Sequence, residues 1–330
     1  MSQVKYDVAG IGNALVDVIA NADDAFLNSE NIQKGGMTLI DADRADTLYS
    51  RMGEAIESSG GSCANTIAGL ASLGGKGAFF GKVKEDQLGQ VFVHDITTLG
   101  VTFPASVAND GAPTGRCLVL VTPDAQRSMS TYLGAAQNLT PDDIDEEVIK
   151  ASAITYMEGY LWDQPSAKEA FLKAAKIARD AGRIVSLTLS DSFCVDRFRP
   201  EFQKLVKDEV DLLFANEAEI LSLYEVSSFD EALERVRKDC KFAALTRSEL
   251  GAVIVADGDV HKVAAEKILK VVDTTGAGDL FAAGFLYGLA RGYKPDHCGR
   301  LGVMAATEII SHYGPRPMVS LKELAVERGL

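Results

Sequence analysis

The second half of the chain alternates short apolar runs with longer amphipathic ones, and this alternation constrains the fold more than any other feature. A helix-like stretch at 165–181, closed by Gly182, is followed at once by an apolar run at 184–189. A repeat of strand and helix favours a parallel sheet with helices on both faces. The sequence therefore predicts a doubly wound, mostly parallel α/β fold. The expected strands are 6–11, 153–157, 184–189, 210–215 and 242–246.

The seven residues Asp273–Asp279 (DTTGAGD) stand directly before an apolar, helix-like run at 280–290. The first N–H groups of a helix have no intrahelical partner and lie at the positive end of the helix dipole. Gly276, Ala277 and Gly278 have little or no side chain, so an anion can approach these N–H groups closely. A carboxylate at Asp279 repels an anion, which favours a chemical role: accepting a proton from a hydroxyl during phosphoryl transfer. The alternative is an acid that only stabilises the first helical turn.

The whole string resembles the C-terminal signature of the ribokinase or PfkB family of ATP-dependent sugar and nucleoside kinases. The resemblance extends over nearly the entire chain, with the motifs in the family's order. It implies a ribokinase-like fold, ATP and Mg²⁺ as cofactors, Asp279 as the general base, and Gly276–Gly278 as an anion hole. It also implies a K⁺ site involving Asp273 and Thr275, because relatives that use a monovalent cation bind it partly at these positions.

Two further motifs lie near the N-terminus. Asp17 sits inside an apolar run, where it is either an exposed residue of a half-buried strand or a buried carboxylate that needs donors such as sugar hydroxyls. Its spacing from Asn13 resembles the first motif of the adenosine kinase branch, which implies that both residues hold a nucleoside. A second resemblance, Gly-Gly-x-x-x-Asn, implies that Gly61 and Asn65 line the substrate site. Ser62 between them is expected to cap the next helix.

The predicted nucleotide and metal residues follow later strands. Asn216 and Glu219 match the family's metal-associated Asn-x-x-Glu spacing, so the resemblance implies that they orient waters on Mg²⁺; acids at a helix start are the alternative. Thr246 and Gly251 belong to a turn that resembles the family's Thr-x-Gly-x-x-Gly, although Ser248 replaces the first glycine. Gly314, in a Gly-Pro-Arg-Pro segment, is expected to close the nucleotide site.

Residues 1–330 are expected to form one ribokinase-like core with a small β lid inserted in it. The lid is expected to consist of two segments that leave the main sheet, at about 14–45 and 103–132. Two alternating runs at 115–121 and 127–132 predict a hairpin, and 43–56 is helix-like. Arg127 begins the second run. It is either a solvated turn residue or, as in adenosine kinases, an arginine that reaches the phosphates. A dinucleotide site at Gly10–Gly12 is disfavoured, because Leu15 occupies the third glycine position of that fingerprint.

Composition excludes several classes of protein. A net charge of −14 argues against a nucleic-acid surface, which needs clustered lysine and arginine. No apolar run reaches 18 residues, so no membrane span is expected. The five cysteines are widely spaced and odd in number, which disfavours a disulfide framework or zinc site and favours the cytoplasm. The expected partners are ATP and a small-molecule substrate, and the protein is expected to be a monomer or homodimer.

These observations predict an ATP-dependent kinase that phosphorylates the 5′-hydroxyl of a nucleoside, adenosine first. The alternative within the family is a sugar kinase for ribose, fructose or a keto-deoxy sugar acid. Outside the class, the alternatives are a non-catalytic ligand sensor on the same fold, which the intact Asp279 disfavours, and a dinucleotide-dependent oxidoreductase.

Overall fold

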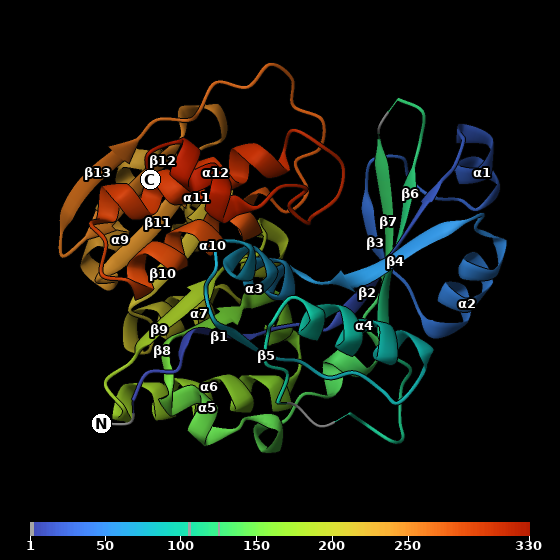
Figure 1. The fold of residues 1–330 in the computed structure, drawn as a ribbon, viewed down its shortest axis with the longest axis horizontal. Helices are drawn as coiled ribbons and strands as arrows, with labels where there is room; N and C mark the ends of the chain where they lie inside the picture. The colour runs from blue at the N-terminus through green and yellow to red at the C-terminus, as the bar shows by residue number, and fades with distance from the viewer. Residues whose placement is uncertain (1–2, 105–106, 125) are drawn as a thin grey trace.

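The structure is a computed structural model that describes residues 3–104, 107–124 and 126–330, and it consists of a large α/β body with a small sheet beside it (Figure 1). The large body is built on an eight-stranded sheet in the order β13-β12-β11-β10-β9-β8-β1-β5. Neighbours from β5 to β11 are parallel, while β12 and β13 are antiparallel. The strands are β1 Tyr6–Ile11, β5 Gly77–Phe80, β8 Ser152–Glu158, β9 Ile184–Thr188, β10 Leu212–Asn216, β11 Phe242–Thr246, β12 Ala252–Ala256 and β13 Asp259–Val263.

Helices cover both faces of this sheet, which confirms the doubly wound class. Side chains of α5 to α9 share one core with the sheet, and side chains of α3, α4, α10 and α11 share the other. Tyr156 and its neighbour Met157 fall in different cores, as alternation along a strand requires. The helices of the body are α3 Ser62–Ser72, α4 Gln87–Thr98, α5 Glu146–Lys150, α6 Pro165–Asp180, α7 Ser192–Asp208, α8 Glu217–Tyr224, α9 Phe229–Asp239, α10 Ala277–Ala290, α11 Pro295–Ile309 and α12 Leu321–Glu327.

The carboxyl ends of β1 and β8 mark the switch point of the sheet. The chain passes from β1 to β5 on one side, and its later strands continue from β8 on the other. In open α/β sheets, ligands bind outside the carboxyl ends of the strands at such a point. Asn13 follows β1 and Glu158 ends β8, so both lie where a substrate is expected.

The second sheet has five strands in the order β3-β7-β6-β2-β4. They are β2 Leu15–Asn21, β3 Met37–Leu39, β4 Ala55–Gly60, β6 Gly115–Val121 and β7 Arg127–Tyr132, with α1 Asp24–Ser29 and α2 Ala42–Arg51 beside them. The predicted hairpin of β6 and β7 is confirmed in both strands; its Ala125 lies outside the described residues.

The ranges expected for the lid omit β4, because the helix-like segment at 43–56 ends earlier than predicted. Helix α2 stops at Arg51, and Gly53 follows, a residue that costs about 1 kcal/mol in a helix interior. Residues 55–60 instead pair with β2 along its length. Pairing with a strand distant in sequence thus overrides local helical pattern here.

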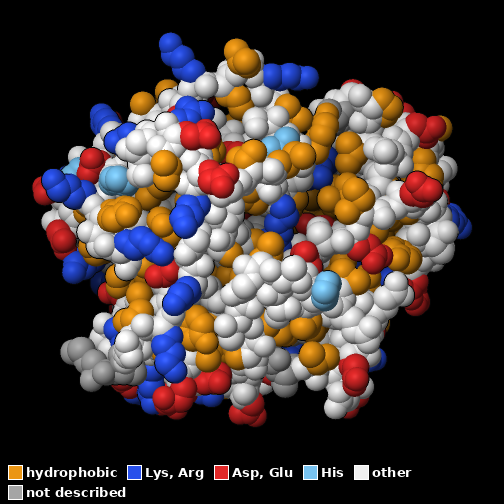
Figure 2. All heavy atoms as spheres, in the orientation of Figure 1, with side chains coloured by type: hydrophobic (Ala, Val, Ile, Leu, Met, Phe, Trp, Pro, Cys, Tyr) orange, Lys and Arg blue, Asp and Glu red, His pale blue; other side chains and the backbone are white. Residues whose placement is uncertain are grey.

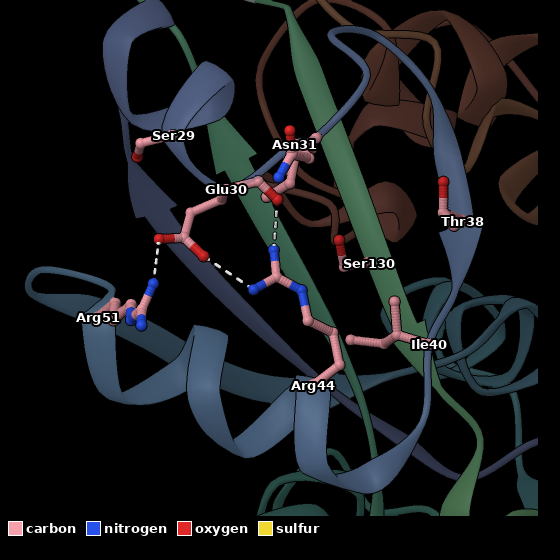
Figure 3. A pocket seen from close by; sticks show the side chains of 9 residues that line it. Ser29, Glu30, Asn31, Thr38, Ile40, Arg44, Arg51 and Ser130 are labelled. Carbon is pink, nitrogen blue, oxygen red and sulfur yellow. Dashed lines mark hydrogen bonds and ion pairs between the residues drawn. The ribbon is translucent and has the colours of Figure 1, made fainter.

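A cavity of about 460 Å³ lies on one face of the small sheet, between α1, α2 and the strands (Figure 3). Glu30 is buried there and accepts from Arg44 and Arg51, each at 2.8 Å. Ser130 of β7 lines the cavity, whereas Arg127, three residues away on the same strand, points to the opposite face. This ion-pair cluster therefore joins α1 to α2 on the face that Arg127 does not share.

The molecular surface carries charges of both signs, and the cysteines lie in the interior. Figure 2 shows lysine and arginine side chains scattered among acidic and apolar ones on the visible face. All five cysteines are free and buried. Across the described residues, no helix combines the length and apolarity needed to cross a bilayer.

Candidate active site

The Asp273–Asp279 segment forms the start of α10, as predicted. Gly276 precedes the helix with φ +79°, a left-handed conformation that favours glycine. Asp273 shapes the approach, because its carboxylate accepts from the N–H of Thr275 at 3.0 Å and of Gly314 at 3.1 Å. A side chain on Gly278 would meet no atom within 4 Å, so the space beside this helix start is open. The segment therefore offers an accessible helix N-terminus of the kind that binds phosphate oxygens.

Asp279 is held by two side chains from α3. Ser62 Oγ donates to its Oδ1 at 2.6 Å, and Asn65 Nδ2 donates to its Oδ2 at 3.0 Å. Burial raises the pKa of Asp279, while these two hydrogen bonds and the charge of Arg316 oppose the increase. Ser62 was expected to cap α3, and that prediction is wrong: Gly61 precedes the helix without a side-chain cap, and the hydroxyl faces Asp279.

Close packing of α3 against α10 brings these donors to Asp279. A Cβ on Gly69 of α3 would lie 2.5 Å from Leu280 Cδ1 and 2.8 Å from Ala283 Cβ, both on α10. Real side chains do not approach so closely, so only glycine allows this separation of the helices. The two helix starts, which carry Ser62 and Asp279, therefore meet.

Asp17 is buried in β2, so the exposed interpretation of this residue is wrong. Its strand lies between β4 and β6, and a Cβ on Gly60 of β4 would fall 2.4 Å from the Asp17 carboxyl carbon. Burial raises the pKa of Asp17 to about 6; Arg316 and then Arg127 lower it, and Asp279 raises it. The buried carboxylate thus occupies a costly position, within range of the charge of Asp279, and such a position is typical of a functional group.

Asn13 and Glu158 meet at the switch point of the large sheet. Asn13 Nδ2 donates to Glu158 Oε1 at 2.8 Å, and the N–H of Cys63 donates to Oε2 at 2.8 Å. Burial raises the pKa of Glu158 to about 7. Glu158 is not among the site residues predicted from the sequence, although its position directly after an expected strand was a usable signal. Gly61 adopts φ +95° and lies against Asn13, since a Cβ there would fall 2.2 Å from the Asn13 carbonyl oxygen.

Arg127 is buried and forms an ion pair with Asp273, Nη1 to Oδ2 at 2.9 Å. The solvated interpretation of this arginine is therefore wrong. The ion pair connects the small sheet directly to the segment that begins α10. Contact of Arg127 with phosphates remains a prediction.

Asn216 ends β10, on the same edge of the sheet as Glu158 at the end of β8, and Glu219 lies in the first turn of α8. Asn216 and Glu219 bind each other: Asn216 N–H donates to Oε2 at 3.0 Å and Nδ2 to Oε1 at 2.5 Å. Burial raises the pKa of Glu219 to about 7; hydrogen bonds from Asn216 oppose this increase, and the charges of Asp191 and then Asp279 add to it. Thr246 ends β11.

The turn after β11 keeps a glycine-like shape despite its departure from the family pattern. Ser248 adopts φ +49°, and Gly251 adopts φ +86° with its Cα so close to Val263 that a Cβ would lie 2.1 Å from the Val263 carbonyl oxygen. Serine at 248 therefore carries the backbone strain that glycine would avoid.

Comparison with known proteins agrees with this arrangement. An adenosine kinase from Sinorhizobium meliloti, of known structure, is 53% identical, with 98% of this chain and 100% of that chain covered and a TM-score of 0.91. A probable sugar kinase from Rhizobium etli CFN 42 is 52% identical, with 99% of each chain covered and a TM-score of 0.92. The adenosine kinase of Saccharomyces cerevisiae is 27% identical over 327 residues, covering 92% of this chain and 95% of that protein.

Fold and site together define a phosphotransferase with an alcohol group as acceptor, on a ribokinase-like α/β fold. Within this class of enzymes the family can be identified, because the sequence profile of the pfkB family of carbohydrate kinases matches residues 29–321. The chain belongs to this family. Kinases of the family use ATP as the phosphoryl donor.

Proposed function

We propose that this kinase transfers the γ-phosphoryl group of ATP to the 5′-hydroxyl of a nucleoside, with adenosine as its substrate. The observation that carries the chemistry is the contact of Asp279 with Ser62 and Asn65 at the open start of α10. The similarity to the Sinorhizobium meliloti adenosine kinase supports the choice of acceptor. Two buried groups, Asp17 and Asn13, add oxygens that can accept hydrogen bonds from ribose hydroxyls.

Asp279 acts as the general base in this proposal. Each of its oxygens accepts one hydrogen bond from α3, which fixes the carboxylate and leaves a second lone pair on each oxygen. A hydroxyl placed at one of these lone pairs loses its proton to Asp279 as its oxygen bonds to the γ-phosphorus and the bond from that phosphorus to ADP breaks. Because the transition state is loose, positioning of the hydroxyl contributes more than base strength.

The N–H groups around Gly278 stabilise the negative charge of the transferring group. They need no reorganisation, because the helix start is already open and shaped by Asp273.

Mg²⁺ fits this site only as an ion held mainly by phosphates and water. Among the described residues, no group of three or more His, Cys, Asp or Glu side chains is arranged to hold a metal. Both oxygens of Glu219 accept from Asn216, and each retains a lone pair for a water molecule. Mg²⁺ usually keeps several waters and supplies charge neutralisation between phosphate oxygens. Asn216 and Glu219 would orient those waters.

A K⁺ ion fits at Asp273 and Thr275 under one condition. Arg127 now neutralises the Asp273 carboxylate at 2.9 Å, so a monovalent cation needs Arg127 to leave. We propose that Arg127 moves onto the phosphates when the small sheet closes as a lid. Thr246, Gly251 and Gly314 would then border the nucleotide.

A sugar kinase is the second candidate, favoured by the similarity to the Rhizobium etli protein, which is as close as the adenosine kinase. A substrate panel separates the two: adenosine, inosine, guanosine, ribose and fructose, each with ATP, with ADP release as the signal. We expect kcat/KM to be at least about tenfold higher for adenosine than for any sugar. The inert analogue 5′-deoxyadenosine is the control for the position of transfer. Faster turnover of ribose or fructose would establish the sugar kinase instead.

A further inference from the structure

Arg316 lies after α11 and reaches the connection between the small sheet and the large body. Its Nη1 donates to the Ala64 carbonyl at 3.0 Å, and its Nη2 donates to Ser59 at 2.5 Å (carbonyl) and 2.7 Å (Oγ). Ser59 belongs to β4 and Ala64 to α3, so one guanidinium spans the crossover from small sheet to body. In Figure 1, β4 runs directly into α3 at this crossover.

The crossover also positions both functional carboxylates. Asp17 packs against Gly60, and Asp279 accepts from Ser62 and Asn65. Gly60, Ser62 and Asn65 all belong to segment 59–65. Movement of this segment therefore changes the position of Asp17 relative to Asp279. Arg316 is bonded to the segment at both of its ends.

No single carboxylate neutralises the charge of Arg316. Its Nη atoms donate to carbonyls and a hydroxyl, and its Nε is buried without a partner. No carboxylate in the described part of the chain lies within ion-pair distance of it, in contrast to Arg127, which is paired with Asp273. A cation held by neutral acceptors acts on every nearby carboxylate at once.

The charged groups around the site have opposing effects on the pKa values of the two functional carboxyls, Asp17 and Asp279. Asp17 experiences Arg316 and Arg127 as attractive charges and Asp279 as a repulsive one, and the Cys117 thiol lies nearby. Asp279 experiences Arg316 as its attractive charge. The charge of Asp95 in α4 also acts on Arg316, and the Asp95 carboxylate accepts from Ser59 N–H at 2.9 Å.

We propose that Arg316 is a positioning residue for phosphoryl transfer: it fixes segment 59–65 and supplies the positive charge that balances Asp17 and Asp279. This proposal rests on the roles given to Asp17 and Asp279 in the proposed function. Two substitutions separate the effects. Arg316→Gln removes the charge and keeps one donor group, whereas Arg316→Lys keeps the charge and loses the planar fork that reaches both ends of the segment.

The pH dependence of kcat/KM for the acceptor is the readout. Loss of a cation raises the pKa of a nearby carboxyl, so a base that must be ionised loses activity first at low pH. We expect the acid limb of Arg316→Gln to move upward by about one pH unit, a tenfold relative loss at about pH 6. Arg316→Lys should keep the wild-type acid limb and raise KM for the acceptor severalfold, with KM for ATP unchanged.

Arg237→Gln is the matched control, because Arg237 also donates twice to a backbone carbonyl, that of Gly258, far along the sheet at its hairpin edge. It should leave both kinetic constants and the pH profile unchanged. A profile of Arg316→Gln parallel to wild type refutes the electrostatic role, and an altered acid limb in Arg316→Lys refutes it even if the glutamine variant does not fold. A wrong proposed function gives a different result from a wrong role for Arg316: if the proposed function is wrong, Asp279→Asn keeps its activity.

Discussion

Replacement of Asp279 by asparagine removes a charge while keeping the shape of the side chain. The amide oxygen can still accept from Asn65, and the amide nitrogen can donate to the Ser62 hydroxyl, so the contacts with α3 survive. Because burial already disfavours the ionised carboxylate, stability at neutral pH should be kept or rise. Loss of a general base costs about 10²–10⁴ in rate. This loss corresponds to about 2.7–5.4 kcal/mol in activation free energy.

The assay is ADP release at saturating adenosine and ATP, together with equilibrium binding of each substrate and a thermal melt. We expect kcat to fall within the stated range, with both dissociation constants close to wild type. The control is Asp296→Asn, since Asp296 is an exposed acid in the first turn of α11, the neighbouring helix. Asp279 is not the general base if Asp279→Asn keeps more than about a tenth of wild-type kcat, because an acid that only stabilises the helix start would behave like Asp296.

Three further predictions concern the surrounding groups. Asp17→Ala should raise KM for the nucleoside and leave that for ATP unchanged, and the wild type should turn over 2′- and 3′-deoxyadenosine poorly; equal turnover of these analogues contradicts the assignment. Arg127→Ala should lower kcat, and Arg127→Lys should recover only part of it, because lysine lacks the planar fork; steady-state kinetics showing wild-type kcat in both variants would exclude a phosphate role. Gly278→Val places its side chain in open space, so the melt should shift little while kcat falls about 10²-fold or more; unchanged kcat would mean that no anion binds there.

Local sequence pattern was sufficient to predict five of the eight strands of the large sheet, β1, β8, β9, β10 and β11. Strands buried on both faces are continuous apolar runs, and those at 6–11 and 242–246 match β1 and β11 in full. The start of α10 was equally predictable, because glycine and acid at a helix start have direct physical meanings. The edge strand β4 was not predictable, since its extended conformation comes from pairing with β2 rather than from the pattern of its own residues.

The missed site residues share a cause. The hydroxyl of Ser62 has a common local use as a helix cap, and only the fold shows that it faces Asp279 instead, 217 positions away in sequence. Glu158 contacts Asn13 across 145 positions. A single sequence states the type of side chain but not its distant partner, so contacts between elements were the part that required the structure.

The absent side chain at Gly69 has an evolutionary consequence. Gly69 lies seven residues along α3 from Ser62, about two helical turns or roughly 10 Å from the reacting groups. Any larger residue at 69 would separate α3 from α10 and lengthen the hydrogen bonds to Asp279, unless position 280 or 283 became smaller at the same time. Among descendants of this chain, these three positions should therefore vary as a set, and a survey of conserved residues confined to the active site would overlook them.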